Sequence, residues 1–478
     1  MIHVTDKKRR VAVIGGGITG LAAAFYLQEQ AKLHHYPLEI VLLESSHRLG
    51  GKLQTLRKDG FIIERGPDSF IDRRGIISSL ATKIGIDHDM IKTAHAKTYI
   101  AINNKELQPV PTSNILGIPT QIKPFMASSL VSWSGKVRAT ADWILPPSRV
   151  DGDQSLGKFV RRRFGEEFVQ NVIEPFLSGV FSGDIDELSL EATLPILRDY
   201  EQQSSSLMRG IRRELTSIEG RAFTKEYNAF NMQTFAKGMD MLVDALATHL
   251  TCQLMKGVRV QSITSYEQQV CLSLNNKSTL AVDGVVVAIP HQSARTLFED
   301  HLLEDLKDIP SNTVATVSMI FKEADLPSFD GTDIFMSRNS DYSLTSLTYE
   351  HKKWSHIAPE GYALVNCYIG RTGDASIVEL SDSEIEKILL EDLHQLSGLN
   401  VQPIETIVSR WKDSMPQYTI GHIERVKRAK ANLHGAFPTV RLAGNSYEGI
   451  SLANCIEQGF NNAEEILAQL FSTQEVVQ

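Results

Sequence analysis

The sequence predicts an α/β protein built from a parallel-sheet domain, an inserted helical domain and a second, mixed sheet. A short apolar strand, a glycine turn and an Ala- and Leu-rich helix open the chain at residues 10–33. Helical patterns dominate residues 155–250, and strand patterns return after Gln253. The chain of 478 residues is also too long for one hydrophobic core, because single cores stop growing at about 250–300 residues.

The individual elements follow from local periodicity. We expect strands at residues 10–14, 38–43, 99–107 (a hairpin), 258–263, 270–274, 284–289, within 314–370 and at 441–443. We expect helices at residues 21–33, 75–90, 155–164, 166–176, 238–250, 384–396 and 451–470. The parallel-sheet domain is then assembled from residues 1–98, 226–290 and 406–478. Residues 99–225 form the mainly helical insertion, and residues 291–405 form the second sheet domain.

Composition excludes several classes of protein. The net charge of -8 argues against a nucleic-acid partner, which would favour a basic surface. The four cysteines form no C-x-x-C pair, so neither a zinc site nor a disulfide framework is expected. We interpret them as buried thiols in a reducing cytosol.

One apolar stretch resembles a targeting segment. Val11 to Leu27 carries no charge and follows the basic run Lys7 to Arg10, as in a signal peptide. Four glycines within six positions and the lack of a cleavage site argue against export and against a membrane span. We therefore expect a soluble, cytoplasmic protein, with at most peripheral membrane contact through residues 109–147.

The glycine run after the first strand carries the first chemical signal. Gly15-Gly16-Gly17-Ile18-Thr19-Gly20 has the G-x-G-x-x-G spacing between a predicted strand and a predicted helix. Glycines there permit a tight turn and let the backbone approach a pyrophosphate at the helix N-terminus. Glu44 follows 24 residues after Gly20, at the end of the next strand, where a ribose hydroxyl needs an acceptor.

A second motif distinguishes between dinucleotides. Arg48-Leu49-Gly50-Gly51-Lys52 forms an R-x-G-G after the carboxylate, which is typical of glutathione-reductase-like FAD proteins. Arg48 offers a fixed cation near phosphate, and the glycines let the chain pass beside the ribityl arm. Gly66-Pro67-Asp68-Ser69 follows at the spacing of a loop that lies along the flavin.

The third motif lies near the other end of the chain. Residues 441–451 indicate a strand, a glycine turn and a helix that opens near Ser451. A helix N-terminus aimed at the flavin would stabilise negative charge on the reduced ring, and Gly449 would allow backbone contact with it. Val260 (beside adenine) and Trp411 (beside the flavin) fit the same site, although plain core positions explain these two equally well.

The order of these segments resembles a known family. VIGGGITGLAAAFYL, ESSHRLGGK, IIERGPDSF, RWKDSMPQYTIGH and AGNSYEGI are similar to the Gram-positive-type porphyrinogen oxidases, coproporphyrinogen III oxidase and protoporphyrinogen oxidase. The segments at 171–184 and 335–341 add to the resemblance, which covers essentially the whole chain. The FAD motifs themselves are shared with amine oxidases and carotenoid desaturases.

The resemblance implies non-covalent FAD that accepts hydride from a porphyrinogen and is reoxidised by O2 with release of H2O2, in three rounds. No side chain is expected to act as a catalytic acid or base, and no metal is expected, since the flavin performs the oxidation. The residues predicted to bind the cofactor are Gly15, Gly16, Gly17, Ile18, Thr19, Gly20, Glu44, Ser45, Arg48, Gly50, Gly51, Lys52, Gly66, Pro67, Asp68, Ser69, Val260, Trp411, Gly444, Gly449, Ile450 and Ser451.

Substrate contacts are less well marked in the sequence. Arg74, just after the flavin loop, is the first candidate for a propionate, and a solvated surface arginine is the alternative. Leu364, Asn366 and Tyr368 share one strand face, so Tyr368 is a candidate contact with the tetrapyrrole. The run Arg161 to Arg163 is interpreted as a solvated helix face rather than a binding patch.

Two rival functions stay open. A flavin amine oxidase or carotenoid desaturase shares the FAD motifs. A non-enzymatic flavin-fold protein that carries porphyrin to the next enzyme of the heme pathway is the second rival, and contact with that enzyme is an expectation for the oxidase as well. The preference between coproporphyrinogen and protoporphyrinogen rests on the family resemblance alone.

Overall fold

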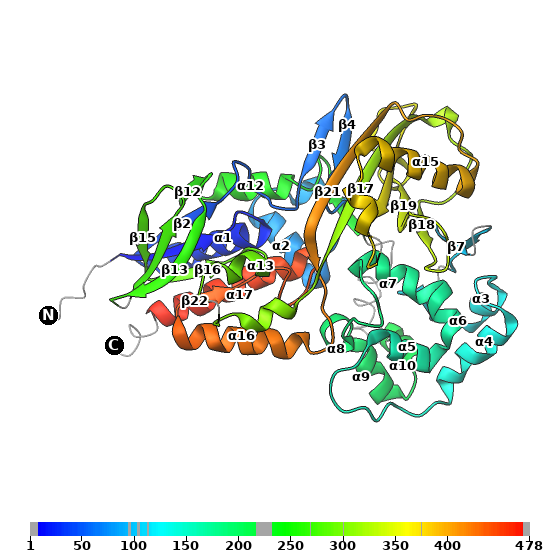
Figure 1. Ribbon diagram of the computed structural model, residues 1–478, viewed down its shortest axis with the longest axis horizontal. Helices are drawn as coiled ribbons and strands as arrows, with labels where there is room; N and C mark the ends of the chain where they lie inside the picture. Colours follow the sequence, from blue (N-terminus) through cyan, green and yellow to red (C-terminus); the bar gives the residue numbers. More distant parts are fainter. Residues whose placement is uncertain are drawn as a thin grey trace.

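The computed structural model describes residues 8–93, 97–102, 106–111, 114–216, 232–267, 269–299, 301–373 and 375–471. Figure 1 shows the parallel-sheet domain at one end of the molecule, together with both chain ends. The mixed sheet and the helical region lie at the other end, one above the other in this view. The predicted α/β fold with a second sheet and an inserted helical region is confirmed.

The parallel sheet collects strands from three separate parts of the chain. They are β1 (Arg9–Ile14), β2 (Leu38–Glu44), β12 (Gln253–Lys256), β16 (Gly284–Val287) and β22 (Val440–Leu442). The strand order is β12-β2-β1-β16-β22, and every neighbouring pair is parallel. The carboxyl ends of all five strands therefore meet at one edge of the sheet, where ligands of such sheets bind.

Each face of this sheet is covered by a different layer. Val11 and Val13 pack with one core and Ala12 and Ile14 with the other, as the alternation of a strand requires. The first core contains α1 (Ile18–Leu33), α2 (Ile76–Lys83), α12 (Met241–His249) and α17 (Leu452–Phe471). The second contains β13 (Val260–Tyr266), β14 (Gln269–Leu274), β15 (Thr279–Val282), α13 (His291–Arg295) and α16 (His422–Ala436).

The second sheet has seven strands in the order β21-β17-β20-β19-β18-β7-β8. Their bounds are β7 (Thr98–Ile102), β8 (Glu106–Pro109), β17 (Ser311–Lys322), β18 (Asp333–Met336), β19 (Ser346–Tyr349), β20 (Tyr362–Ile369) and β21 (Glu405–Pro416). All pairs are antiparallel except β7 with β18. Helix α15 (Asp382–Ser397) packs with this sheet in a shared core.

Two segments belong to the second sheet, although the sequence predicts them in other domains. The hairpin of β7 and β8 was expected with the helices, yet it joins the second sheet through β18. Strand β21, expected in the parallel-sheet domain, pairs with β17 along its length. Strand pairing is a long-range contact that local periodicity does not record. The expected helix over residues 75–90 is also shorter, since α2 ends at Lys83 before Gly85 with its φ of +73°.

Short elements complete the fold. They are β3 (Thr55–Lys58), β4 (Phe61–Glu64), β5 (Phe70–Ile71), β6 (Met90–Lys92), β9 (Asn114–Ile115), β10 (Ile118–Pro119), β11 (Met232–Phe235) and α14 (Glu350–Lys353). The helical region contains α3 (Ile122–Ala127), α4 (Trp133–Thr140), α5 (Leu156–Phe164), α6 (Glu166–Phe168), α7 (Glu174–Phe181), α8 (Leu190–Thr193), α9 (Ile196–Ser204) and α10 (Leu207–Thr216). Across the described ranges, the helices are too short or too polar to span a bilayer.

The arginine run at the end of α5 is not a solvated face. Arg163 is fully buried, and its Nε donates to Asp142 Oδ1 over 2.6 Å. Arg162 pairs with Glu201 over 2.9 Å, and Arg161 pairs with Glu166 over 2.9 Å. The interpretation from sequence was therefore wrong, because Asp142 and Glu201, which pair with Arg163 and Arg162, come from distant parts of the helical region.

Breaking the buried pair should destabilise the helical region. Asp142→Ala removes the closer counter-ion of the buried Arg163 and leaves only Glu201, whose Oε1 lies 3.5 Å from Nη1, and breaking a buried pair costs about 3–5 kcal/mol. We expect the urea midpoint, followed by far-UV circular dichroism, to fall markedly. Asp151→Ala, at an exposed position, serves as the control. An unchanged midpoint in Asp142→Ala would contradict this account.

Candidate active site

The glycine turn after β1 accepts no larger residue at two positions. A Cβ on Gly15, whose φ is +105°, would lie 2.4 Å from the Ala288 carbonyl oxygen. A Cβ on Gly20 would lie 1.9 Å from the Gly15 carbonyl oxygen. Helix α1 begins at Ile18 with no side-chain cap, so its first N–H groups are available to an anionic ligand. This geometry fits the pyrophosphate cradle that the spacing predicts.

Glu44 lies at the end of β2, beside this turn. Its Oε2 accepts a hydrogen bond from the Gly16 N–H over 2.7 Å, and its Oε1 accepts one from the Ser46 N–H over 2.8 Å. The Glu44 carbonyl accepts from the Val258 N–H over 3.0 Å, which brings the start of β13 and Val260 close by. The carboxylate is therefore held where a ribose hydroxyl can donate to it.

The R-x-G-G loop is tied to the glycine turn through its backbone. The Gly50 N–H donates to the Gly16 carbonyl over 2.8 Å. Arg48 donates to the carbonyls of Leu49 and Leu53, each over 3.0 Å, and to that of Gly51. Arg48 thus holds the shape of its own loop, and its contact with a phosphate stays a prediction.

Strand β21 lies beside the R-x-G-G loop and the loop at 66–69. Contacts of Lys52, Gly66 and Trp411 hold these segments together. Lys52 Nζ donates to the Ser414 carbonyl, and burial lowers the pKa of Lys52 to about 8. Trp411 Nε1 donates to the Arg65 carbonyl over 2.7 Å. A Cβ on Gly66 would lie 2.0 Å from the Lys52 carbonyl oxygen, so the loop passes its neighbour with backbone alone.

The C-terminal motif closes the site from the other end of the chain. Gly444 and Gly449 have φ values of +132° and +105°. Tyr418 joins the two halves of this turn, since its hydroxyl donates to the Asn445 carbonyl over 2.8 Å and accepts from the Gly449 N–H over 2.9 Å. Ser451 Oγ accepts from the Asn454 N–H over 3.2 Å and caps α17, where the sequence predicts the helix to open.

A large cavity of about 520 Å³ adjoins these loops. The sheet, helix α7 and the loops each contribute part of its wall, including Lys52, the loop at 66–69, Phe176, Tyr368, Arg371 and Trp411. This volume is in the range of small-molecule sites. Tyr368 lines the cavity, and its contact with a substrate stays a prediction. Burial beside Asp68 and Glu350 raises the pKa of its hydroxyl, which stays protonated.

Arg74, the other predicted substrate residue, lies elsewhere. Its side chain is 65% exposed, and Nη2 pairs with Glu457 of α17 over 2.6 Å. It is not part of the cavity wall. The sequence placed it near the site because it follows the flavin loop closely, but a left-handed backbone at Arg74, with φ +57°, turns the chain into α2.

Charged residues that sequence reasoning missed line the cavity. Lys353 is 5% exposed and pairs with Asp68 over 2.9 Å and with Asp333 over 3.8 Å. Burial would lower the pKa of Lys353, but the carboxylates of Asp68 and Asp333 raise it above its ordinary value. Burial would likewise raise the pKa of Asp68, and Lys353 outweighs this and lowers it. No motif marks these residues, because the tertiary structure brings Lys353 of α14, Asp333 of β18 and Arg371, which follows β20, to the same cavity.

Similarity to known proteins identifies the family of this chain. The model of a family described as flavin containing amine oxidoreductase matches residues 18–467. The chain belongs to the flavin-containing amine oxidoreductase family. Members of this family carry a flavin and act as oxidoreductases, so the predicted flavin cofactor and oxidoreductase class are confirmed.

Similar proteins of this family are known in other bacteria. The chain is 42% identical to coproporphyrinogen III oxidase of Bacillus subtilis, covering 98% of this chain and all of that one. It is 36% identical to coproporphyrinogen III oxidase of Staphylococcus aureus, covering 97% of this chain and 100% of that one. A crystal structure from Exiguobacterium sp. 255-15, assigned to protoporphyrinogen oxidase, has a TM-score of 0.87 at 31% identity, covering 97% and 99% of the chains.

The position of Glu44 makes its role testable. Glu44→Gln keeps the size of the side chain but removes its charge, and a hydrogen bond to a charged group contributes about 1.5–3 kcal/mol. We expect flavin affinity to fall by about 10- to 100-fold, measured by titrating flavin-free protein with FAD. Glu39→Gln, on the same strand, is the control. Equal affinity in wild type and Glu44→Gln would remove Glu44 from the cofactor site.

Proposed function

We propose that this protein binds FAD non-covalently and oxidises coproporphyrinogen III to coproporphyrin III, with O2 as the electron acceptor. The observation that carries this proposal is the 520 Å³ cavity that lies directly against the predicted flavin loop and has cations in its wall. The full-length similarity to proteins named coproporphyrinogen III oxidase supports the choice of substrate.

The choice of FAD rests on the adenosine half of the predicted site. Glu44 suits a ribose, and the start of α1 suits a pyrophosphate, two groups that FAD places in this order. FAD, when bound, supplies a hydride acceptor that O2 can reoxidise. We propose non-covalent binding because Cys455 is buried inside α17 as a free thiol.

The chain's own residues position the reactants. Loop 66–69 forms the wall of the cavity on the flavin side, and Tyr368 offers a hydroxyl from the opposite sheet. The N-termini of α1 and α17 present N–H groups and partial positive charge to the cofactor. Phe176 and Val180 of α7 give the wall an apolar surface for the macrocycle.

Arg371 is our candidate for a substrate carboxylate. It follows Gly370, the residue after β20. Gly370 has a φ of +96°, and a Cβ on it would lie 2.5 Å from the Thr313 carbonyl oxygen. Its guanidinium donates to the Tyr342 carbonyl over 3.3 Å and forms no ion pair within the described part of the chain. A cavity-lining guanidinium with free N–H groups suits a propionate.

The proposed activity is tested by direct assay. We expect purified holoprotein to convert coproporphyrinogen III faster than protoporphyrinogen IX, with H2O2 formed, as measured by porphyrin fluorescence and peroxide. Amines are the control substrates. Turnover of amines alone would assign an amine oxidase, and a yellow protein inert towards every porphyrinogen would assign a carrier.

Arg371→Leu should weaken binding of the tetracarboxylate. Loss of a charge-assisted hydrogen bond costs about 1.5–3 kcal/mol, so we expect KM for coproporphyrinogen III to rise about 10- to 100-fold. The rise should be smaller for protoporphyrinogen IX, which has fewer carboxylates to hold. Lys412→Leu, which removes a cation that is 63% exposed on β21, is the control. Equal effects on both substrates would place Arg371 outside the recognition of carboxylates.

A further inference from the structure

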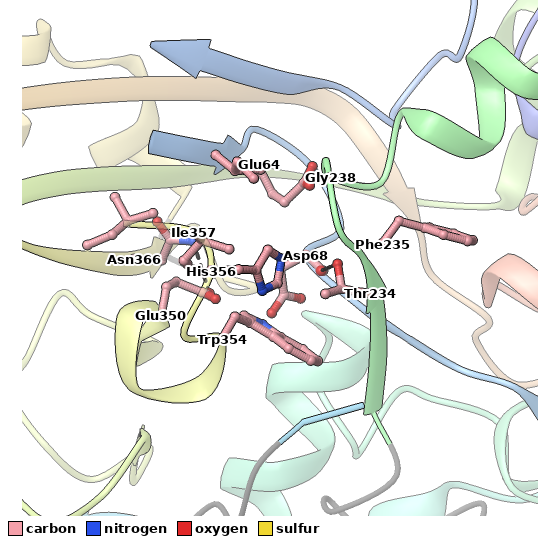
Figure 2. Close-up of a pocket in the computed structure, with 12 residues that line it drawn as sticks. Glu64, Asp68, Thr234, Phe235, Gly238, Glu350, Trp354, His356, Ile357 and Asn366 are labelled. Carbon is pink, nitrogen blue, oxygen red and sulfur yellow. Dashed lines mark hydrogen bonds between the residues drawn. The ribbon is translucent and has the colours of Figure 1, made fainter. Parts of the chain in front are cut away.

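A second, much smaller cavity lies behind the wall of the large one. Its volume is about 10 Å³, and Asp68 lines both cavities. That volume is about one probe sphere, enough for a single water molecule. Figure 2 shows Asp68, Trp354 and His356 converging on this space, with Thr234 on one side and Glu350 on the other.

The small cavity is polar and contains buried groups that need a partner. Within the described residues, Trp354 Nε1 and His356 Nε2 are buried and have no hydrogen-bond partner. Trp354 is only 2% exposed, so bulk water does not reach its indole N–H. Buried polar groups of native proteins are almost always satisfied, by ordered water where protein partners are absent. We infer that one water molecule occupies this cavity, accepting from Trp354 Nε1 and donating to His356 Nε2 and Asp68.

The proposed reaction creates a proton as well as a hydride in each round. As a meso C–H bond breaks, its electron pair and hydrogen leave as hydride to the flavin. A proton then leaves, from a pyrrole N–H bond in two of the three rounds and from the fourth meso carbon in the other, and the electron pair of the broken bond stays on the substrate to complete the new double bond. The wall of the cavity is mainly apolar, so the proton needs an ionisable group of that wall to accept it. This inference rests on the proposed function, which defines the reaction.

We propose that Asp68, the buried water and His356 form the route by which this proton leaves the cavity. The Asp68 carboxylate accepts the proton on the side of the large cavity. It then passes a proton to the water, while the water gives one of its own to His356 Nε2. The water is unchanged, Asp68 is an anion again, and the His356 ring, in a residue that is partly exposed, carries the proton until it exchanges with solvent.

The groups around the small cavity favour His356 over the other acceptors. Burial lowers the pKa of His356, so the ring is neutral between rounds, and its buried Nε2 has no hydrogen-bond partner among the described residues. Burial raises the pKa of Glu64 to about 8 and that of Glu350 well above its ordinary value. Both glutamates therefore hold their own protons near neutral pH. Lys353 keeps Asp68 ionised between rounds through its 2.9 Å contact.

The route is tested by following proton release and flavin reduction together. Holoprotein is mixed with coproporphyrinogen III in the absence of O2, in weak buffer with an indicator dye. In wild type we expect the dye to respond in step with the loss of flavin absorbance. In His356→Leu we expect proton release, read from the dye, to be at least tenfold slower than flavin reduction. In His356→Ala, added imidazole should restore the rate of proton release.

His351→Leu is the matched control. His351 also has a buried Nε2 without a partner in the described residues, but it lines neither cavity. We expect its proton release to match wild type. Proton release in step with flavin reduction in His356→Leu would overturn the route, as would an equal lag in His351→Leu.

A crystal structure provides a readout that does not depend on turnover. We expect one ordered water within about 3 Å of both Trp354 Nε1 and His356 Nε2, and a dry cavity would overturn the route. A porphyrinogen that fails to reduce the wild-type flavin would instead overturn the proposed function and the route that rests on it, while the water would still be present.

Discussion

The close approach of the first and last helices is the constraint on which the site depends. A Cβ on Gly459 of α17 would lie 2.5 Å from the Thr19 carbonyl oxygen of α1. With β22 and β1 in the same parallel sheet, this contact brings residues 441–451 beside the glycine turn at 15–20. The chain ends are far apart in sequence, and glycine at the helix contact is what allows the two backbones to meet.

The large cavity lies where the parallel-sheet domain, the second sheet domain and the helical region meet, and each of them contributes side chains to its wall. The loop at 66–69 comes from the parallel-sheet domain, Lys353 and Asp333 from the second sheet domain, and Phe176 from the helical region. The ion pair between Lys353 and Asp68 therefore links two domains directly at the cavity wall. Burying such a pair costs desolvation and seldom adds much net stability, so its position beside the flavin loop indicates a functional purpose.

Local patterns predicted the strand-turn-helix units at the two ends of the chain well. These units include the glycine turn, Glu44 and the cap of α17. Each depends on residues close to it in the chain, so residue type and spacing alone predict it. Tyr368 was found by strand alternation alone. Arg74 and the run Arg161 to Arg163 were placed poorly, because the carboxylates that pair with them, Glu457, Glu201 and Asp142 among them, come from distant segments.

By itself, the sequence determined the fold class, the flavin motifs and the oxidoreductase family, since all three depend on short motifs and their order along the chain. Only the tertiary structure decided which charges face the cavity and which water-sized space lies behind Asp68. Arg371, Lys353 and His356 carry no motif, and each reaches its place through strand pairing or packing between domains. Contacts of this kind depend on the register and packing of whole elements, which local residue patterns do not encode.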